Sequence, residues 1–134
     1  PVFLMDYPEG GSYSLHLAHP KGNVAVQGSA GFLRGALKNY RAEVLFLGIG
    51  RLGNQFKAYQ RAYYDETAGF LKPRLIIPVH WEDHTETLDK PLQPLKGSMD
   101  RFDEAMEFLQ KRVAQEPGVT LQLMRAFEEI VLFE

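Results

Sequence analysis

Two short apolar runs without polar interruption constrain the fold of this chain most strongly. Residues 44–47 read Val-Leu-Phe-Leu, and residues 74–80 form a second run that ends at His80, with Pro78 near its end. A strand without apolar–polar alternation is usually buried on both faces, as in a parallel sheet that helices cover. Because proline cannot donate to a strand ladder, Pro78 predicts that the second strand ends close to His80.

The segments around these two runs predict further strands and helices. Gly and Pro residues punctuate the chain so that strands and helices alternate. Asn54 is a candidate N-cap for the central helix, and Ser98 or Asp100 for the last one. Strict alternation indicates strands and a three-to-four-residue spacing indicates helices. Strands are expected at residues 12–19, 24–27, 119–123 and 130–133, and helices at residues 33–40, 54–70 and 98–115.

Apolar spacing assigns a buried face to some of these elements. Tyr13, Leu15 and Leu17 lie on one face of the first strand, which predicts a half-buried strand. A short apolar run at residues 2–5 and a turn at residues 7–11 precede it. The last helix carries an apolar stripe at helical spacing, made of Phe102, Met106, Leu109 and Val113.

These elements predict an α/β (α+β) fold with a mixed β-sheet and flanking helices, in which residues 1–134 form a single domain or half-domain. The chain is 45% hydrophobic and 24% charged, which suits a packed core. A net charge of −2 argues against a dedicated nucleic-acid binder. No apolar run approaches the roughly 18 residues of a transmembrane helix, so no membrane partner is expected. The opening residues lack a signal-peptide pattern, which predicts a cytoplasmic protein.

A glycine-rich loop follows the first apolar run. Residues 48–53 read Gly-Ile-Gly-Arg-Leu-Gly, which matches the dinucleotide fingerprint G-x-G-x-x-G. Such a loop lets the backbone approach a pyrophosphate at a helix N-terminus. The fingerprint also requires an acidic residue about 20 positions on, whereas the acidic residues after the next strand lie further along. Two interpretations stay open, a dinucleotide site on these glycines or a tight turn that lines a cleft.

His80 and the loop at residues 28–31 are further candidates by position. A histidine at the carboxyl end of a buried strand lies where α/β sheets place ligands, and neutral imidazole is the commonest metal ligand. A hydrogen-bonded, purely structural histidine is the other interpretation. Residues 28–31 read Gly-Ser-Ala-Gly. That second small-residue loop either lines the mouth of a site or is a plain turn. The absence of cysteine excludes disulfides and Cys-ligated zinc.

Three segments together resemble the C-terminal half of a metallo-β-lactamase-fold hydrolase. They are SYSLHLAHPKGNVAVQGSAGF, AEVLFLGIGRLG and AYQRAYYDETAGFLKPRLIIPVHWED, which cover roughly residues 10–84. The most specific piece is the apolar strand that ends in Pro-x-His-Trp-x-Asp. Members of this superfamily are αββα sandwiches built from two similar halves, with a metal site at the sheet edges between them.

The resemblance implies roles for individual residues. His80 corresponds to the last metal-ligand histidine of the family, and Trp81 and Asp83 then lie beside the site or in its wall. Gly28 and Ser29 stand where many members carry a metal-bridging aspartate, which implies one metal, or a second that is weakly held. The implied metal is a divalent cation, with zinc expected, and most of its ligands lie outside this chain.

The main ligand cluster of the family, His-x-His-x-Asp-His, belongs to the N-terminal half and does not occur in this sequence. We therefore expect the C-terminal part of a metal-dependent hydrolase, in which metal-activated water attacks an ester, amide or phosphoester of a small-molecule substrate. By itself the chain should bind metal weakly and be inactive. Its expected partner is the N-terminal half of the same protein or a second copy of the chain. The alternative is a non-catalytic binding or assembly module with a degenerate hydrolase half-fold.

Overall fold

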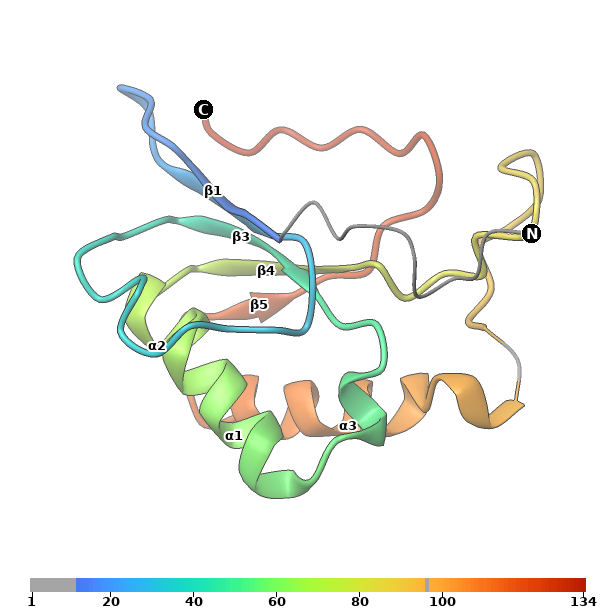
Figure 1. Ribbon diagram of the computed structural model, residues 1–134. Helices are drawn as coiled ribbons and strands as arrows, with labels where there is room; N and C mark the ends of the chain where they lie inside the picture. Colours follow the sequence, from blue (N-terminus) through green and yellow to red (C-terminus); the bar gives the residue numbers. More distant parts are fainter. Residues whose placement is uncertain (1–11, 96) are drawn as a thin grey trace, which may run out of the picture.

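The chain forms a five-stranded mixed sheet with helices packed on it (Figure 1). The computed structural model describes residues 12–95 and 97–134. The strands lie in sequence order, with β1 antiparallel to β2 and all other neighbours parallel. This arrangement confirms the predicted α/β class. The strands are β1 (Ser14–Leu17), β2 (Val24–Gln27), β3 (Val44–Gly48), β4 (Leu75–Val79) and β5 (Thr120–Leu121).

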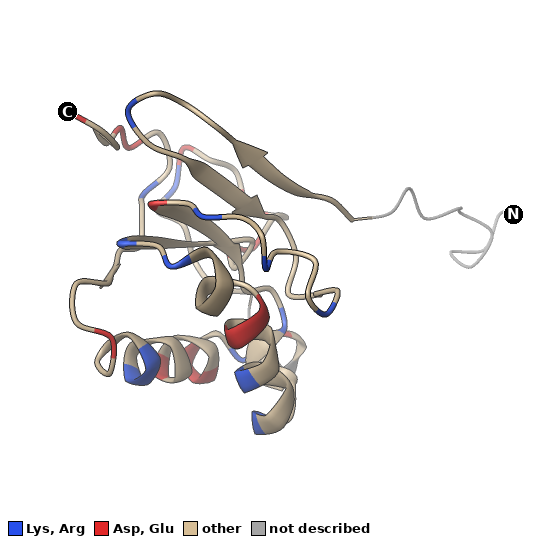
Figure 2. Ribbon diagram, turned by 90° about the vertical axis from the view of Figure 1, so that its left-hand side faces the viewer, with Lys and Arg blue, Asp and Glu red and all other residues tan. Residues whose placement is uncertain are grey.

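The helices lie together on one face of the sheet, and the C-terminal segment runs over the other (Figure 1). They are η2 (Leu52–Asn54), α1 (Lys57–Glu66), α2 (Ala68–Leu71), η3 (Gly97–Met99) and α3 (Phe102–Val113). Charged residues lie on these helices and on the loops rather than on the strands (Figure 2). Within residues 12–95 and 97–134, no helix has the length and apolar character needed to cross a membrane.

The main core lies between the sheet and the helices. Leu45, Leu47 and Ile76 are fully buried on the helix side of β3 and β4. Because both strands are apolar at every position up to their ends, they also have a second buried face, as the two apolar runs predict. The predicted stripe of α3 closes this core: Met106 and Leu109 are buried, and Phe102 and Val113 pack at its margin.

The other sheet face is covered in part by the C-terminal segment. Val44, Leu75 and Ile77 form a second buried cluster, against which the last residues pack, namely Ile130, Leu132 and Phe133. The strand predicted at residues 130–133 is wrong, because this segment has no ladder to a neighbouring strand. Its run of four apolar residues instead includes side chains that cover the sheet face, those of Ile130, Leu132 and Phe133.

All three predicted helices differ from the observed ones, and the helix predicted at residues 98–115 extends only over α3, Phe102–Val113. Residues 33–40 form successive turns closed by bonds from Ala36 N–H to Leu33 and from Tyr40 N–H to Leu37. Gly35 has a φ of 71°, which a right-handed helix excludes. The central helix predicted at residues 54–70 begins only at Lys57, and Thr67 separates α1 from α2 with φ −111° and ψ −89°.

The predicted helix caps are also wrong. Asn54 does not cap α1, whose N-cap is Phe56. The side-chain oxygen of Asn54 instead accepts the N–H of Arg101, the N-cap residue of α3, at 2.9 Å. Asp100 does not cap α3 either, and its carboxylate accepts the N–H of Arg51 at 3.0 Å. Both polar side chains therefore tie the glycine-rich loop to the start of α3.

The first strand is shorter and more exposed than predicted. Leu15 and Leu17 of β1 are 56% and 55% exposed, although they pair with Val26 and Val24 on the apolar face of the sheet. The C-terminal segment covers the middle of that face, and β1 lies at its edge (Figure 1). The apolar run predicted at residues 2–5 and the turn at residues 7–11 lie outside the described residues.

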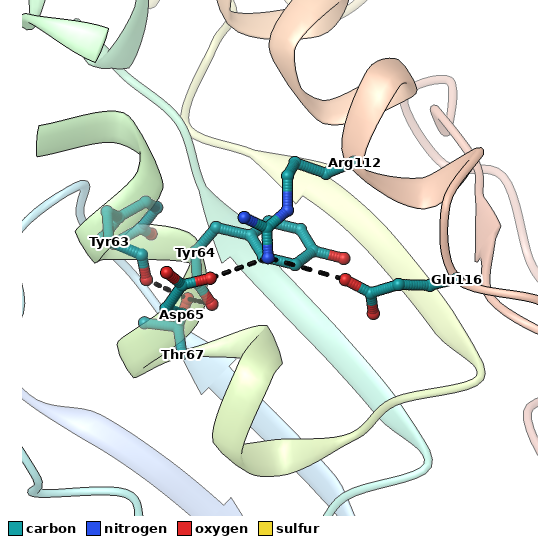
Figure 3. Close-up of polar contacts among 6 residues, drawn as sticks. All are labelled: Tyr63, Tyr64, Asp65, Thr67, Arg112 and Glu116. Atoms are coloured by element: carbon teal, nitrogen blue, oxygen red, sulfur yellow. Dashed lines mark hydrogen bonds and ion pairs between the residues drawn. The ribbon is translucent and has the colours of Figure 1, made fainter. Parts of the chain in front are cut away.

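Helices α1 and α3 are joined by Arg112 (Figure 3). Its guanidinium lies 4.4 Å from the centroid of the Tyr64 ring, 2.7 Å from the Asp65 carboxylate and 3.7 Å from the Glu116 carboxylate. Burial, with the nearby Glu116 carboxylate, raises the pKa of the Tyr64 phenol well above its ordinary value. The phenol therefore stays neutral, and the cation stacks on an uncharged ring.

Candidate functional site

The predicted site residues follow the carboxyl ends of three neighbouring parallel strands. Gln27 of β2 pairs with Leu47 of β3, and Leu47 pairs with Pro78 of β4. The residues that follow these three paired positions, Gly28, Gly48 and Val79, therefore lie at the same edge of the sheet, and His80 comes directly after Val79. Ligands of open α/β sheets bind beyond this edge.

Gly48 allows the first two loops to touch through their backbones. A Cβ at Gly48 would lie 2.7 Å from the carbonyl carbon of Gly28 and 2.7 Å from the nitrogen of Ser29. Any side chain at position 48 would therefore push the β2 loop away from β3. This contact explains why position 48 is a glycine.

The other two glycines of the loop also meet backbone. A Cβ at Gly50 would lie 2.7 Å from the carbonyl oxygen of His80, and one at Gly53 would lie 1.9 Å from that of Arg101. The glycine-rich loop is thus a junction on which three other segments pack. Helix α1 begins only at Lys57. This geometry favours the tight-turn interpretation, and the dinucleotide interpretation on Gly48, Gly50 and Gly53 stays a prediction.

Tyr63 of α1 fixes both loops with one hydroxyl group. The hydroxyl donates to the carbonyl oxygen of Gly48 at 2.6 Å and lies 3.0 Å from that of Ser29. Burial raises the pKa of this phenol well above its ordinary value, so it remains a donor. One turn earlier, Tyr59 donates to Ala30 at 3.0 Å. These two tyrosines of α1 therefore hold the loops through backbone carbonyl groups.

Gln27 is a buried polar residue that the sequence patterns do not single out. Its amide nitrogen donates to the carbonyl oxygens of Ser29 and Gly31, at 3.2 and 2.7 Å. Its amide oxygen accepts the hydroxyl of Ser14. These bonds fold residues 28–31 back over the end of β2. The only sequence signal is a glutamine that ends an apolar strand.

His80 begins the segment after β4 in an uncommon backbone conformation. Its φ is 56°, in the left-handed region that non-glycine residues rarely occupy, and its side chain is exposed. The imidazole lies beside Gly50, where a Cβ would be 3.3 Å from Nδ1. Such strained positions often occur at functional sites. The left-handed backbone of His80 and the close approach to Gly50 together place the imidazole at the edge of the sheet.

A groove runs away from His80, which we call the His80 groove. It consists of two adjoining hollows of about 330 and 850 Å³. His80 lines the smaller hollow, and Trp81 lines both. Trp81 is buried, and its ring packs on Phe102 with the centroids 5.0 Å apart. The structure therefore places two of the predicted site residues in one wall.

The other predicted site residues do not share this groove. Ser29 lines a separate cavity of about 280 Å³ beneath β1 and β2. Gly28 is exposed, with nothing within 4 Å of a Cβ placed on it. Asp83 accepts the N–H of Thr85 at 3.0 Å and its hydroxyl at 2.6 Å, which fixes the turn after Trp81.

The described residues offer only part of a metal site. Among residues 12–95 and 97–134, no group of three or more His, Asp or Glu side chains is placed to hold a metal ion. A catalytic zinc takes three protein ligands and leaves a fourth position open. His80 is therefore a candidate single ligand, and these residues do not make a complete zinc centre by themselves.

Residues of the C-terminal segment face the His80 groove, and sequence patterns do not identify them. They are Met124, Arg125 and Phe127, which line both hollows. They follow β5 in a segment without regular secondary structure, where no periodicity marks one face.

Comparison of the chain with protein-family models, with curated proteins and with solved structures finds no match.

The glycine contacts lead to a test of stability. Gly53→Ala should lower the free energy of unfolding by about 3 kcal/mol, because its Cβ would strike the backbone of Arg101. The matched change Gly28→Ala adds the same methyl group in open space, and should alter the free energy by less than about 1 kcal/mol. Urea unfolding measures both. Equal losses of stability in the two variants would contradict the close packing of the glycine-rich loop on the backbone of Arg101.

The buried phenol of Tyr63 leads to a test of pH dependence. Above pH 10.0, the ordinary pKa of tyrosine, the unfolded chain loses this proton while the folded chain retains it. The free energy of unfolding should therefore fall as the pH rises beyond that value. Tyr63→Phe should make this fall less steep and cost about 1–2 kcal/mol at pH 7.

A control for this test is Tyr13→Phe, which removes a hydroxyl from a residue that is 76% exposed. It should leave both the stability at pH 7 and the alkaline slope unchanged. Urea unfolding between pH 7 and pH 11 provides the measurement. A Tyr63→Phe protein with the native slope and native stability would show that the hydroxyl does not hold the loops.

Proposed function

We propose that this chain is the C-terminal half of a metal-dependent hydrolase of the metallo-β-lactamase superfamily, with His80 as a metal ligand. The observation that carries the proposal is the placement of His80. Its exposed imidazole follows a buried parallel strand, is backed by Gly50, and opens onto a groove. The resemblance of roughly residues 10–84 to that family supports the same role.

The proposal assigns limited tasks to the residues of this chain. His80 would bind a divalent cation, zinc above all, and Trp81 would form the wall beside it. Residues 28–31 and 48–53 would shape the edge of the cleft, because Tyr63 and Gly48 hold them together. The substrate would be a small molecule with an ester, amide or phosphoester bond.

The remaining metal ligands would come from a partner. The apolar face of the sheet supports this part of the proposal, because Tyr13, Leu15 and Leu17 are 76%, 56% and 55% exposed at its β1 side. Exposed apolar surface of this kind commonly marks an interface. The N-terminal half of the same protein or a second copy of the chain would cover it. Alone, the chain would bind metal weakly and would not catalyse hydrolysis.

A non-catalytic assembly module is the second candidate function. The same exposed face of β1 favours it, together with the incomplete ligand set among the described residues. The two candidates differ in what precedes Pro1 in the coding sequence. An in-frame His-x-His-x-Asp-His supports the hydrolase, and a coding sequence without this motif supports the module.

The role of His80 can be tested by zinc binding. Isothermal titration of the chain with Zn²⁺ should show weak binding that His80→Ala weakens by more than about tenfold. His84→Ala is the matched control, because His84 is also an exposed histidine of the same loop. It should leave the affinity unchanged.

The same pair of variants tests the activity of the protein in which this chain and its N-terminal half are joined. His80→Ala should lower both the zinc content and the turnover of a chromogenic ester or phosphodiester, and His84→Ala should preserve them. Native zinc content and native turnover in His80→Ala would contradict the assignment.

A further inference from the structure

The His80 groove has apolar walls that are open to solvent. Leu88 is 56% exposed and Phe127 is 82% exposed, and both line its two hollows. The buried ring of Trp81 forms a further wall. Covering such surface stabilises a complex by about 25 cal/mol for each Å² of apolar area removed from water. The groove is therefore suited to an apolar group of a ligand.

Phe127 is held at the rim of the groove by its turn. Its φ is 60°, which costs energy for a residue with a bulky side chain. The turn is closed by two hydrogen bonds between Arg125 and Glu128: the N–H of Glu128 donates to the Arg125 carbonyl at 3.2 Å, and the N–H of Arg125 donates to the Glu128 carboxylate at 2.7 Å. The turn thus keeps an exposed phenyl ring beside the opening rather than in a core.

Arg125 supplies a positive charge to the same opening. Arg125 lines both hollows, and no described carboxylate lies within ion-pair distance of its guanidinium. Lys90, the other lining cation, is paired with Glu86 at 2.6 Å. Two acidic residues also line the groove. Glu82 lines the smaller hollow, and its carboxylate accepts the N–H of Trp81 at 3.0 Å. Asp89 lines only the larger hollow.

We infer that the His80 groove binds a small amphipathic carboxylate, with its hydrocarbon part against Trp81 and Phe127 and its carboxylate on Arg125. A guanidinium fork matches the two oxygens of a carboxylate, and charge-assisted bonds of this kind are about twice as strong as neutral ones. The smaller hollow, about 330 Å³, has the size of a small-molecule site. The inference concerns binding alone and does not depend on the proposed metal.

The chain offers a direct probe, because Trp81 is its single tryptophan. Titration with sodium octanoate in the presence of EDTA should change the tryptophan emission saturably. Arg125→Gln should weaken octanoate binding by about tenfold, while the binding of 1-octanol, which has no charge, should not change. Arg125 takes part in its turn through backbone groups, so this variant keeps the fold.

A second pair of variants tests the apolar contact. Phe127→Gly removes the ring and also relieves the positive φ, and should weaken both octanoate and octanol. The control is Phe56→Ala, which removes a ring that is 87% exposed and does not line the groove. No saturable emission change, native octanoate affinity in Arg125→Gln, or an equal loss in Phe56→Ala would overturn the inference.

Discussion

The contact between Gly48 and the backbone of Gly28 and Ser29 is the constraint on which the rest of this structure depends. It brings the ends of β2 and β3 close enough for one phenol, that of Tyr63, to hold both loops by hydrogen bonds. Because the hydroxyl is buried, each unmade bond would leave a polar group without a partner, which costs about 1–3 kcal/mol. The contact therefore fixes the carboxyl edge of the sheet as one unit, and α1 with it.

His80 takes its position from the same unit. Gly50 leaves room for the His80 carbonyl, and the N–H of Ile49 donates to Val79 at 2.9 Å, so the segment after β4 follows the glycine-rich loop closely. On the far side of that loop, Gly53 leaves room for the Arg101 backbone, and Asn54 and Arg51 form hydrogen bonds with the residues that precede α3. A loop that resembles a nucleotide fingerprint in sequence thus acts in this structure as the joint between the sheet and two helices.

The two faces of the sheet are covered to different degrees by other segments of the chain. Helices α1 and α3 pack closely over β3 and β4 on one face, with residues such as Leu45 and Leu109 fully buried. The C-terminal segment covers only the middle of the other, leaving Leu15 and Leu17 in contact with solvent. That asymmetry is the structural basis for proposing a partner. It is also the reason why the groove beside His80 is open.

The parts of the fold that the sequence predicts are those with a strong apolar pattern. The uninterrupted apolar runs of β3 and β4 are buried on both faces, and the stripe of α3 buries the face that its spacing predicts. Residues 33–40 have a helical composition, but Gly35 takes a positive φ that composition does not reveal. The short apolar run at residues 130–133 packs on the face of the sheet, and such a run alone does not distinguish this packing from pairing in a strand ladder. At the site, strand ends predict the place of His80. Arg125 and Phe127 reach the groove through tertiary packing of an irregular segment, for which no local pattern exists.

The central claim is that the Gly48 and Tyr63 junction presents His80 as a metal ligand at the carboxyl edge of the sheet. Titrating ¹⁵N-labelled chain with Co²⁺ and recording the amide spectrum tests it most directly. The account predicts paramagnetic shifts and broadening centred on Ile49, Gly50 and Trp81, whose amides neighbour His80, and their loss in His80→Ala. Broadening centred on His16, His19 or His84, or an unchanged pattern in His80→Ala, would contradict it.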